Sequence, residues 1–451
     1  MSASEILLVI LVPHPTRRAV LTTPDGVLPT ATWQASSTLD QVDPVQLDAV
    51  AARLGSRPAV LRSVLGPMDE AGDSDRRLIE FETIGEDAPA GLTWIETSAL
   101  DLAAAVPDGL RDAVRRAIER YRDGQNPLDP PWSRPGWLAR ASAWMLDRMA
   151  ELGSPATAPP RVVHLWGIAI VLRAESAAGA MFLKRSARIF AHEAAVTGLL
   201  AELTPDLVTR VAAVEPDEGW LLMHDQGDKA LGARPPEAWV VGVDRLATIQ
   251  QAWTERTGEL ARAGAPVRPI AELADDVATF ATRDAFASRL SADQRSAWDT
   301  AIPEFAAACR RLDELGPAPT LVHGDFHPWN IADGPDGPRV FDWTDAAISH
   351  PFTDLAVFAT RPTDVAVRRM IRDAYLARWS DHMDPAALAE AGDLAIVVGT
   401  VYQVETYIRL VESLDPDDLW DLAPAAGSWA RSAVAALREG IDLVRPGHAD
   451  A

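Results

Sequence analysis

Residues 321–332 read Leu-Val-His-Gly-Asp-Phe-His-Pro-Trp-Asn-Ile-Ala, and residues 339–345 read Arg-Val-Phe-Asp-Trp-Thr-Asp. Asp325 and Asn330 lie in the first stretch, and Asp342 follows the apolar pair in the second. Metal-assisted phosphoryl transfer needs a carboxylate beside the attacking hydroxyl and hard oxygen ligands that hold Mg²⁺ against the phosphates. Asp325 suits the first task, and Asn330 and Asp342 suit the second. The alternative is a turn-rich loop whose Asp and Asn side chains only cap backbone groups.

The order and spacing of these residues resemble the catalytic loop and metal-binding strand of the aminoglycoside phosphotransferase family, which shares the protein-kinase fold. The resemblance extends over residues 160–440. It implies that Asp325 is the catalytic base and that Asn330 and Asp342 bind Mg²⁺.

Three further residues of this region receive supporting roles from the resemblance. It implies that His323 is structural and packs under the loop, and that Asp354 ties the loop down through backbone hydrogen bonds. His327 lies inside the loop, where we interpret it as a packing residue and not as a base.

A nucleotide site is expected upstream of the loop. The chain has only two lysines, Lys184 and Lys229, in an otherwise arginine-based set of cations. Lys184 ends a predicted strand, and Glu193 lies early in the helix that follows. The resemblance implies that Lys184 contacts the ATP phosphates, that Glu193 holds Lys184, and that adenine binds near Met223 and Asp225. On its own, Glu193 would be an ordinary solvated helix charge.

Two departures from the protein-kinase pattern bear on the activity. The first predicted hairpin contains only Gly167 in place of a glycine-rich loop, and the Asp-Phe-Gly triplet is replaced by Asp342-Trp-Thr. Residues 343–353, between Asp342 and Asp354, are too few to display a peptide substrate. A small acceptor is therefore favoured over a protein.

The acceptor is expected to bind near the C-terminal helices, where acidic and aromatic residues gather. These residues are Glu405, Tyr407, Glu412, Asp415, Asp417, Asp418, Trp420 and Asp421. Such a set suits an amine-bearing sugar, although each acidic residue taken singly is more simply a solvated helix end. Bacterial maltokinases and glucosamine kinases carry an N-terminal cap, and the layout of this chain is similar to theirs.

The predicted fold is α+β: a bilobal protein-kinase-like fold preceded by a smaller α+β domain. We expect an N-terminal cap at 1–125, a linker and helix at 126–160, a kinase N-lobe at 161–230 and a kinase C-lobe at 231–451. Strands are predicted at 5–12, 19–22, 78–83, 161–168, 169–174, 180–184, 207–214 and 219–224, and helices at 44–54, 109–121, 137–152 and 189–203.

Composition sets the remaining bounds. The net charge of −23 argues against binding to nucleic acid or to anionic membranes, and it is compatible with a cationic acceptor. No apolar run reaches the ~20 residues of a membrane span. The single cysteine, Cys309, excludes an intramolecular disulfide framework, so we expect a cytoplasmic protein.

The leading hypothesis is a Mg²⁺- and ATP-dependent kinase acting on a sugar-like hydroxyl acceptor, either an aminoglycoside or an amino sugar. One alternative is a catalytically silent, nucleotide-binding regulatory protein. Another is a kinase of a non-sugar alcohol. The sequence does not decide the oligomeric state.

Overall fold

The structure is a computed structural model that describes residues 4–35, 50, 54, 60–65, 74–82, 85–123, 126–227, 229–419, 422 and 424–440. Apart from Val50 and Leu54, the helix predicted at 44–54 lies outside these residues. The chain forms two compact units, one of residues 1–188 with 413–420 and one of 189–412 with 421–451. The domain limits that the sequence suggests, which differ from these units, stay a prediction.

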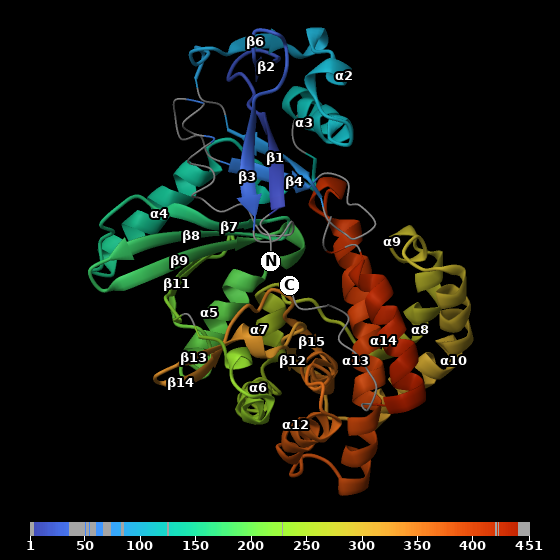
Figure 1. Cartoon of the computed structure of the whole chain (residues 1–451). Coiled ribbons are helices and arrows are strands. Elements are labelled where there is room, and N and C mark those ends of the chain that lie inside the picture. The colour runs from blue at the N-terminus through green and yellow to red at the C-terminus, as the bar shows by residue number, and fades with distance from the viewer. Residues whose placement is uncertain are drawn as a thin grey trace. The chain divides into compact units, whose positions relative to one another are not determined.

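The first unit begins with a mixed four-stranded sheet in the order β3-β1-β5-β4 (Figure 1). β1 pairs antiparallel with β3 and parallel with β5, and β4 pairs antiparallel with β5. The strands are β1 (Ser4–Leu11), β3 (Thr30–Ala35), β4 (Val60–Leu65) and β5 (Arg76–Phe81). The central strand β1 is apolar almost throughout, as expected of a strand that is covered on both faces.

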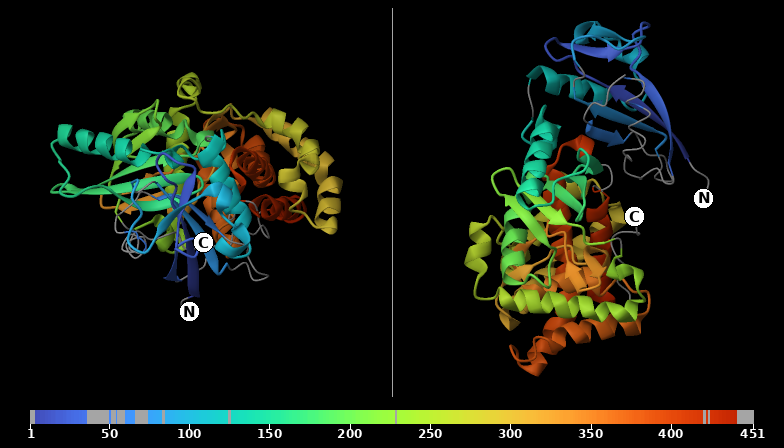
Figure 2. Two further views of the ribbon diagram at one scale, coloured as in Figure 1. Left: turned by 90° about the horizontal axis from the view of Figure 1, so that it is seen from above. Right: turned by 90° about the vertical axis from the view of Figure 1, so that its left-hand side faces the viewer.

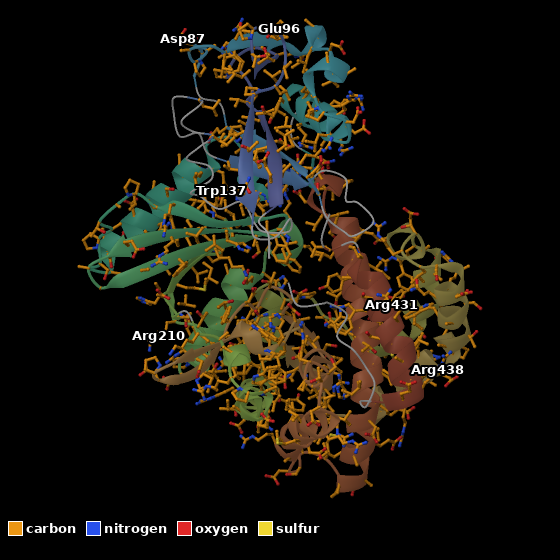
Figure 3. All side chains as sticks on the ribbon, viewed as in Figure 1. Asp87, Glu96, Trp137, Arg210, Arg431 and Arg438 are labelled. Carbon is orange, nitrogen blue, oxygen red and sulfur yellow. The ribbon has the colours of Figure 1, made fainter. Side chains whose placement is uncertain are left out.

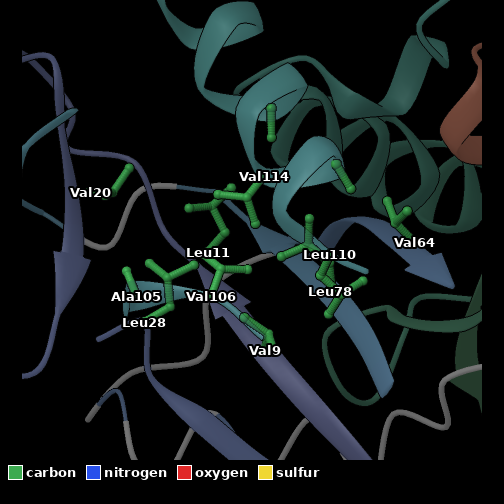
Figure 4. Close-up of a cluster of buried hydrophobic side chains, with 12 residues drawn as sticks. Val9, Leu11, Val20, Leu28, Val64, Leu78, Ala105, Val106, Leu110 and Val114 are labelled. Atoms are coloured by element: carbon green, nitrogen blue, oxygen red, sulfur yellow. The ribbon is translucent and has the colours of Figure 1, made fainter. Parts of the chain in front are cut away.

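Helix α3 (Arg111–Asp123) supplies much of the core of this sheet (Figure 4). Val114 and Ala117 lie three residues apart on its buried side and pack with Val9 and Leu78 of the strands. This spacing places apolar side chains on one helix face, which explains the amphipathic pattern of the helix.

The rest of the first unit carries the strands that precede the second unit. The elements are β2 (Ala19–Thr22), β6 (Thr93–Glu96), α2 (Leu102–Ala105), α4 (Trp137–Glu151), β7 (Arg161–Trp166), β8 (Ala169–Ser176) and β9 (Gly179–Ser186). β2 pairs with β6, and β7, β8 and β9 form consecutive antiparallel pairs. Lys184 lies in β9 opposite Val171.

The second unit is mostly helical and includes short strand pairs. Its strands are β10 (Val211–Glu215), β11 (Trp220–His224), β12 (Thr320–Val322), β13 (Ile331–Gly334), β14 (Gly337–Val340) and β15 (Ala347–Ser349). Its helices are α5 (Glu193–Leu203), α6 (Val240–Ala252), α7 (Thr257–Arg262), α8 (Ile270–Asp276), α9 (Asp284–Ala287), α10 (Ala292–Leu315), α11 (Leu355–Phe358), α12 (Val365–Ala377), α13 (Pro385–Ser413) and α14 (Ala425–Glu439). The long helix α10 packs against α8 and α14 (Figures 1 and 2).

The β13–β14 hairpin is held by the segment that precedes β10. The backbone N–H of Thr209 donates to the carbonyl of Val340 at 3.0 Å. Arg210, labelled in Figure 3, forms an ion pair with Asp336 in the turn of the hairpin. These contacts matter for function because the hairpin joins the residue pair Asn330 and Asp342.

One helix in the described part of the chain, α13, is long and apolar enough by composition to cross a membrane. In the structure, 83% of its most apolar window is buried inside the protein, as in the core helix of a globular fold. The α+β class predicted from the sequence is confirmed. The predicted strands and helices that fall on described residues are found with ends shifted by a few residues, while β3, β4, β6 and α2 of the first unit were not predicted.

Candidate active site

The start of the loop at His323 and Gly324 is tied to a buried aspartate. The backbone N–H groups of these two residues donate to the carboxylate of Asp354 at 2.8 and 2.9 Å. Gln250 adds a third hydrogen bond to the same carboxylate at 3.0 Å. Burial raises the pKa of Asp354 to about 7, against these hydrogen bonds, which favour the ionised form. The role predicted for Asp354 is therefore confirmed by its geometry.

Gly324 is required by the backbone at the turn into the loop. Its φ of +82° lies in the left-handed region, and an added Cβ would collide with the carbonyl oxygen of Asp345. Its own carbonyl accepts a hydrogen bond of 2.6 Å from Gln403 of α13. The loop is thus supported from α13 as well as from Asp354.

His323 lies under the loop, as predicted. It is fully buried, and its Nε2 lies 3.0 Å from the carbonyl oxygen of Phe341. Burial lowers the pKa of His323 to about 4, so the ring is neutral near pH 7. It joins the loop to the strand end before Asp342.

Asp325 is open to an acceptor, because 42% of its side chain is exposed. Its Oδ2 lies 3.5 Å from Nε2 of His327. Partial burial opposes ionisation, but the nearby charge of His327, with smaller contributions from His323 and Arg361, holds the pKa of Asp325 below its ordinary value. Asp325 is therefore an ionised carboxylate that can orient a hydroxyl and accept its proton.

Asn330 and Asp342 are brought together by the β13–β14 hairpin. Ile331 pairs with Val340, and the N–H of Phe341 donates to the carbonyl of Asn330 at 3.0 Å. The Nδ2 of Asn330 donates to the Asp325 carbonyl at 3.1 Å, which leaves the amide oxygen of Asn330 for a cation. This orientation of the amide fits a hard metal ion.

Asp342 has an unusual backbone conformation. Its φ is +64°, and it is the one non-glycine residue with positive φ among those the structure describes. The Thr344 hydroxyl donates to its Oδ1. Strained backbone of this kind is often found at functional sites, where it aims a side chain that a relaxed strand would direct elsewhere.

A metal at this site would take only part of its ligands from the protein. Within the described ranges, no group of three His, Cys, Asp or Glu side chains is placed to hold an ion. An Asn and an Asp that share the ion with phosphate oxygens and water are the usual arrangement for Mg²⁺ beside a nucleotide. The donor set therefore fits Mg²⁺ bound together with a nucleotide.

The predicted nucleotide residues lie in both units. Lys184 is buried in β9 of the first unit, and Glu193 is buried at the first turn of α5 in the second. Their pairing therefore stays a prediction. Met223 lies in β11, and the carboxylate of Asp225 accepts a hydrogen bond of 2.8 Å from the N–H of Gly227. The binding of adenine near Met223 and Asp225 stays a prediction.

The acidic residues predicted for the acceptor are largely paired with arginines. Glu405 lies 2.8 Å from Arg268, and Glu412 forms a double contact with Arg283. The last helix, α14, adds further basic residues, among them Arg431, which Figure 3 labels. Trp420 and Asp421 lie outside the described residues. The acidic side chains of α13 are therefore not a free anionic surface.

Three more acidic residues from the same prediction are buried in the first unit. Arg62 of β4 lies 2.6 Å from Asp418 and 3.2 Å from Asp129, with both acids almost inaccessible. Asp417 pairs with Arg116 of α3. The full cluster also includes Glu80, Arg120 and Asp415. These aspartates hold segment 413–420 in the first unit, which corrects the interpretation that they bind the acceptor.

Sequence reasoning missed three residues of the site. Gln250 and Gln403 support the loop from helices, and Arg361 places a positive charge near Asp325. A buried glutamine in an apolar helix is a weak sequence signal, because glutamine is common on exposed helix faces. Nothing in the spacing of Arg361 distinguishes it from the many other arginines.

Comparison with known proteins agrees with this geometry. Residues 171–391 match the model of the phosphotransferase enzyme family. No protein of curated function matches the chain. The matched range contains the loop, the hairpin and Asp354, so the resemblance drawn from the sequence is confirmed.

Several solved structures are similar to this chain. A macrolide 2'-phosphotransferase from Brachybacterium faecium shares 19% identity over 66% of this chain and 98% of its own, with a TM-score of 0.41. An ethanolamine kinase from Plasmodium vivax shares 10% identity over 62% and 83%, with a TM-score of 0.45. A choline/ethanolamine kinase family protein from Mesorhizobium loti shares 16% identity over 67% and 95%, with a TM-score of 0.42.

Proposed function

We propose that this chain phosphorylates a hydroxyl of a sugar-like small molecule. The premise is that residues 171–391 belong to the phosphotransferase enzyme family and that the chain is an ATP-dependent phosphotransferase with an alcohol group as acceptor. The observation that carries the proposal is the arrangement of the loop: Asp325 is exposed and ionised, and the Asn330 amide oxygen and the Asp342 carboxylate are presented beside it.

In the proposed reaction, Asp325 accepts a hydrogen bond from the acceptor hydroxyl and takes its proton as the oxygen attacks the γ-phosphorus. The bond between the γ-phosphorus and the β,γ-bridging oxygen breaks, and ADP leaves with that oxygen. Phosphoryl transfer depends mainly on positioning and on stabilisation of the developing charge. Mg²⁺, when bound, neutralises the charge of the phosphate oxygens. Asn330 and Asp342 would hold it, and the hairpin keeps these two residues in register.

Lys184 and Glu193 are proposed to act as a pair on the nucleotide. Lys184 is a buried ammonium that directly follows the apolar run 180–183 of β9, and Glu193 is buried at the start of a helix. A buried charge needs a partner, so each of these residues has reason to face another charge in the assembled site. Adenine is proposed to bind along the backbone near Met223 and Asp225.

The identity of the acceptor is the finer part of the proposal. An aminoglycoside or amino sugar was predicted from the acidic residues near the C-terminus, but those described are paired with arginine. We therefore retain the proposal of a sugar-like acceptor, without the requirement that it carry an amine. We also propose a cytoplasmic location, where ATP is available.

A coupled ADP-release assay tests the proposed function. The full chain is incubated with ATP, Mg²⁺ and a panel of sugars, amino sugars, aminoglycosides and amino alcohols. The expected result is acceptor-dependent ADP release that EDTA abolishes and excess Mg²⁺ restores. Release that is absent for every acceptor, or unaffected by EDTA, would contradict the proposal and favour a silent nucleotide-binding protein.

A further inference from the structure

We infer that the acceptor is a neutral, hydroxyl-rich ring and not an ammonium-bearing one, with Arg361 and Trp329 setting this preference beside Asp325. The inference rests on the proposed function, because it concerns the acceptor that Asp325 would activate. It narrows the proposed acceptors from sugar-like molecules in general to sugar-like molecules without a charge.

Arg361 places a positive charge near Asp325. Its guanidinium lies 5.8 Å from the ring centroid of Trp329, four residues after Asp325, and its charge acts on the Asp325 carboxylate, which also lies 3.5 Å from the imidazole of His327. An acceptor whose hydroxyl reaches Asp325 must place its neighbouring substituents among these groups. An ammonium group next to the reacting hydroxyl would meet like charge there, which specificity in binding sites commonly uses to exclude a ligand.

Trp329 offers an apolar surface four residues after the base. It is 41% exposed, and it is the only aromatic side chain among the large hydrophobic residues that are exposed within the described part of the chain. One side of the indole lies against Gly232, where an added Cβ would come within 2.7 Å of the ring. The edge of Trp239 lies 5.8 Å away between ring centroids.

The ring is therefore held in place while part of it stays open to solvent. An aromatic ring fixed in this way can pack against the C–H face of a sugar, a contact that needs no charge on the ligand. The guanidinium of Arg361 lies 5.8 Å from the centroid of the same ring, so the apolar surface and the positive charge are adjacent.

The two carboxylates of α13 that were predicted to attract an amine, Glu405 and Glu412, are already paired with arginines. Glu405 is shared between Arg268 at 2.8 Å and Arg409 at 3.6 Å, and Glu412 is bound to Arg283. Binding an ammonium group to either carboxylate would mean displacing an arginine from a charge-assisted contact. Positive charge near the base and paired carboxylates on α13 lead independently to the same acceptor class.

Matched acceptors test the inference in the full chain. Glucose, N-acetylglucosamine and glucosamine differ only in the substituent at C2, and the β-1,4-linked disaccharides cellobiose, diacetylchitobiose and chitobiose differ only in the same substituent on both rings. We expect kcat/KM for the neutral members to exceed that for the ammonium members by about tenfold or more. Acetylation of the amine should restore turnover.

Variants identify the residues responsible. Arg361→Glu should shift the ratio toward ammonium acceptors by about tenfold or more, with Arg361→Gln intermediate and available if the reversal impairs folding. Trp329→Ala should raise KM for neutral acceptors about tenfold and leave KM for ATP unchanged. Arg262→Glu makes the same charge change on α7 and should leave the acceptor ratio unmoved.

The outcomes separate this inference from the proposed function. Efficient use of ammonium acceptors by the wild type, or an acceptor ratio that neither Arg361 variant changes, overturns the inference and leaves the kinase activity standing. A rise in KM for ATP in Trp329→Ala, with KM for acceptor unchanged, would move Trp329 to the nucleotide side. ADP release from none of the acceptors, including the wider panel, overturns the proposed function and this inference with it.

Discussion

Asp325 combines features that are usually opposed, because it is held by a buried loop and yet keeps an exposed, ionised carboxylate. The anchoring contacts are made by the backbone of His323 and Gly324, so the carboxylate itself remains available. This separation of support from chemistry makes the base testable by a conservative substitution.

Asp325→Asn should lower kcat by about 10²-fold or more, because an amide accepts no proton from the hydroxyl. Affinity for MgATP should change little, since the amide keeps the size of the side chain. Steady-state kinetics and calorimetry on the same preparation measure both quantities. Turnover close to wild type would remove Asp325 from the role of base.

Asp342→Ala should abolish the Mg²⁺-dependent part of nucleotide binding, because a hard dication loses a carboxylate oxygen. Titration of ATP with and without Mg²⁺ gives this difference directly. Asp336→Ala is the matched control in the turn of the same hairpin, where the residue pairs with Arg210. Equal MgATP affinity in both variants would exclude Asp342 as a metal ligand.

Among the elements, helix α13 supports the catalytic loop through a single buried hydrogen bond. Gln403 donates to the carbonyl of Gly324 at 2.6 Å. Gln403→Leu leaves that carbonyl buried and unsatisfied, which should cost about 1–3 kcal/mol of stability. The substitution should also lower kcat more than it raises KM for ATP, because the loop carries Asp325, the proposed base.

The control is Gln251→Leu on α6, where the side chain donates to the carbonyl of Arg378 near the surface. That substitution should change stability by about 0.5 kcal/mol or less. Urea unfolding and kinetics on both variants check the comparison. If the two glutamines prove equivalent, α13 does not position the loop.

At the scale of the whole molecule, the buried ion cluster joins segment 413–420 to the other residues of the first unit. Arg62 is 2% exposed, and the pKa of Asp418 is raised to about 7, because burial outweighs the attraction of Arg62. Arg62→Met leaves several buried carboxylates without their main partner and should destabilise the protein by about 3–5 kcal/mol. Arg311→Met, at a surface pair with Glu390, should cost far less, because solvent screens that pair. Thermal unfolding of the two variants measures this contrast, and similar losses would show that burial of the cluster has no special weight.

His350 contributes a pH dependence of known sign. It is buried, its Nδ1 accepts from the N–H of Phe352 at 3.2 Å, and burial lowers the pKa of His350 to about 4. The unfolded chain therefore binds more protons between its ordinary pKa and that value, and stability falls as pH falls through this window. From pH 7 to pH 5 this residue should remove about 2 kcal/mol.

His350→Asn keeps an acceptor for the N–H of Phe352 and does not titrate, so its unfolding free energy should decline less over this range. The difference between the two proteins isolates His350 from Asp354 and Asp418, whose raised pKa values act in the opposite direction. Urea unfolding at several pH values measures the difference. Parallel pH profiles would contradict the assignment.

The sequence by itself determined the fold class, the family and the position of the loop that carries Asp325. These depend on the spacing of residues that lie close together along the chain. Asp325, Asn330 and Asp342 are close along the chain or joined by one short hairpin, and the apolar runs around them predict the strands that bring them together. The supporting role of Asp354 was implied by the family resemblance, and its hydrogen bonds with the backbone of His323 and Gly324 agree with it.

Tertiary structure decided the charges around the site. The acidic residues from Glu405 onward looked like an anionic acceptor surface, but distant arginines pair with those that are described: Arg268 and Arg283 in the segments before α8 and α9, and Arg62 in β4. Such pairing between residues hundreds of positions apart follows from packing and leaves no local periodicity. Burial likewise set the pKa of His323 and Asp354, because desolvation depends on what surrounds a side chain and not on its neighbours in sequence.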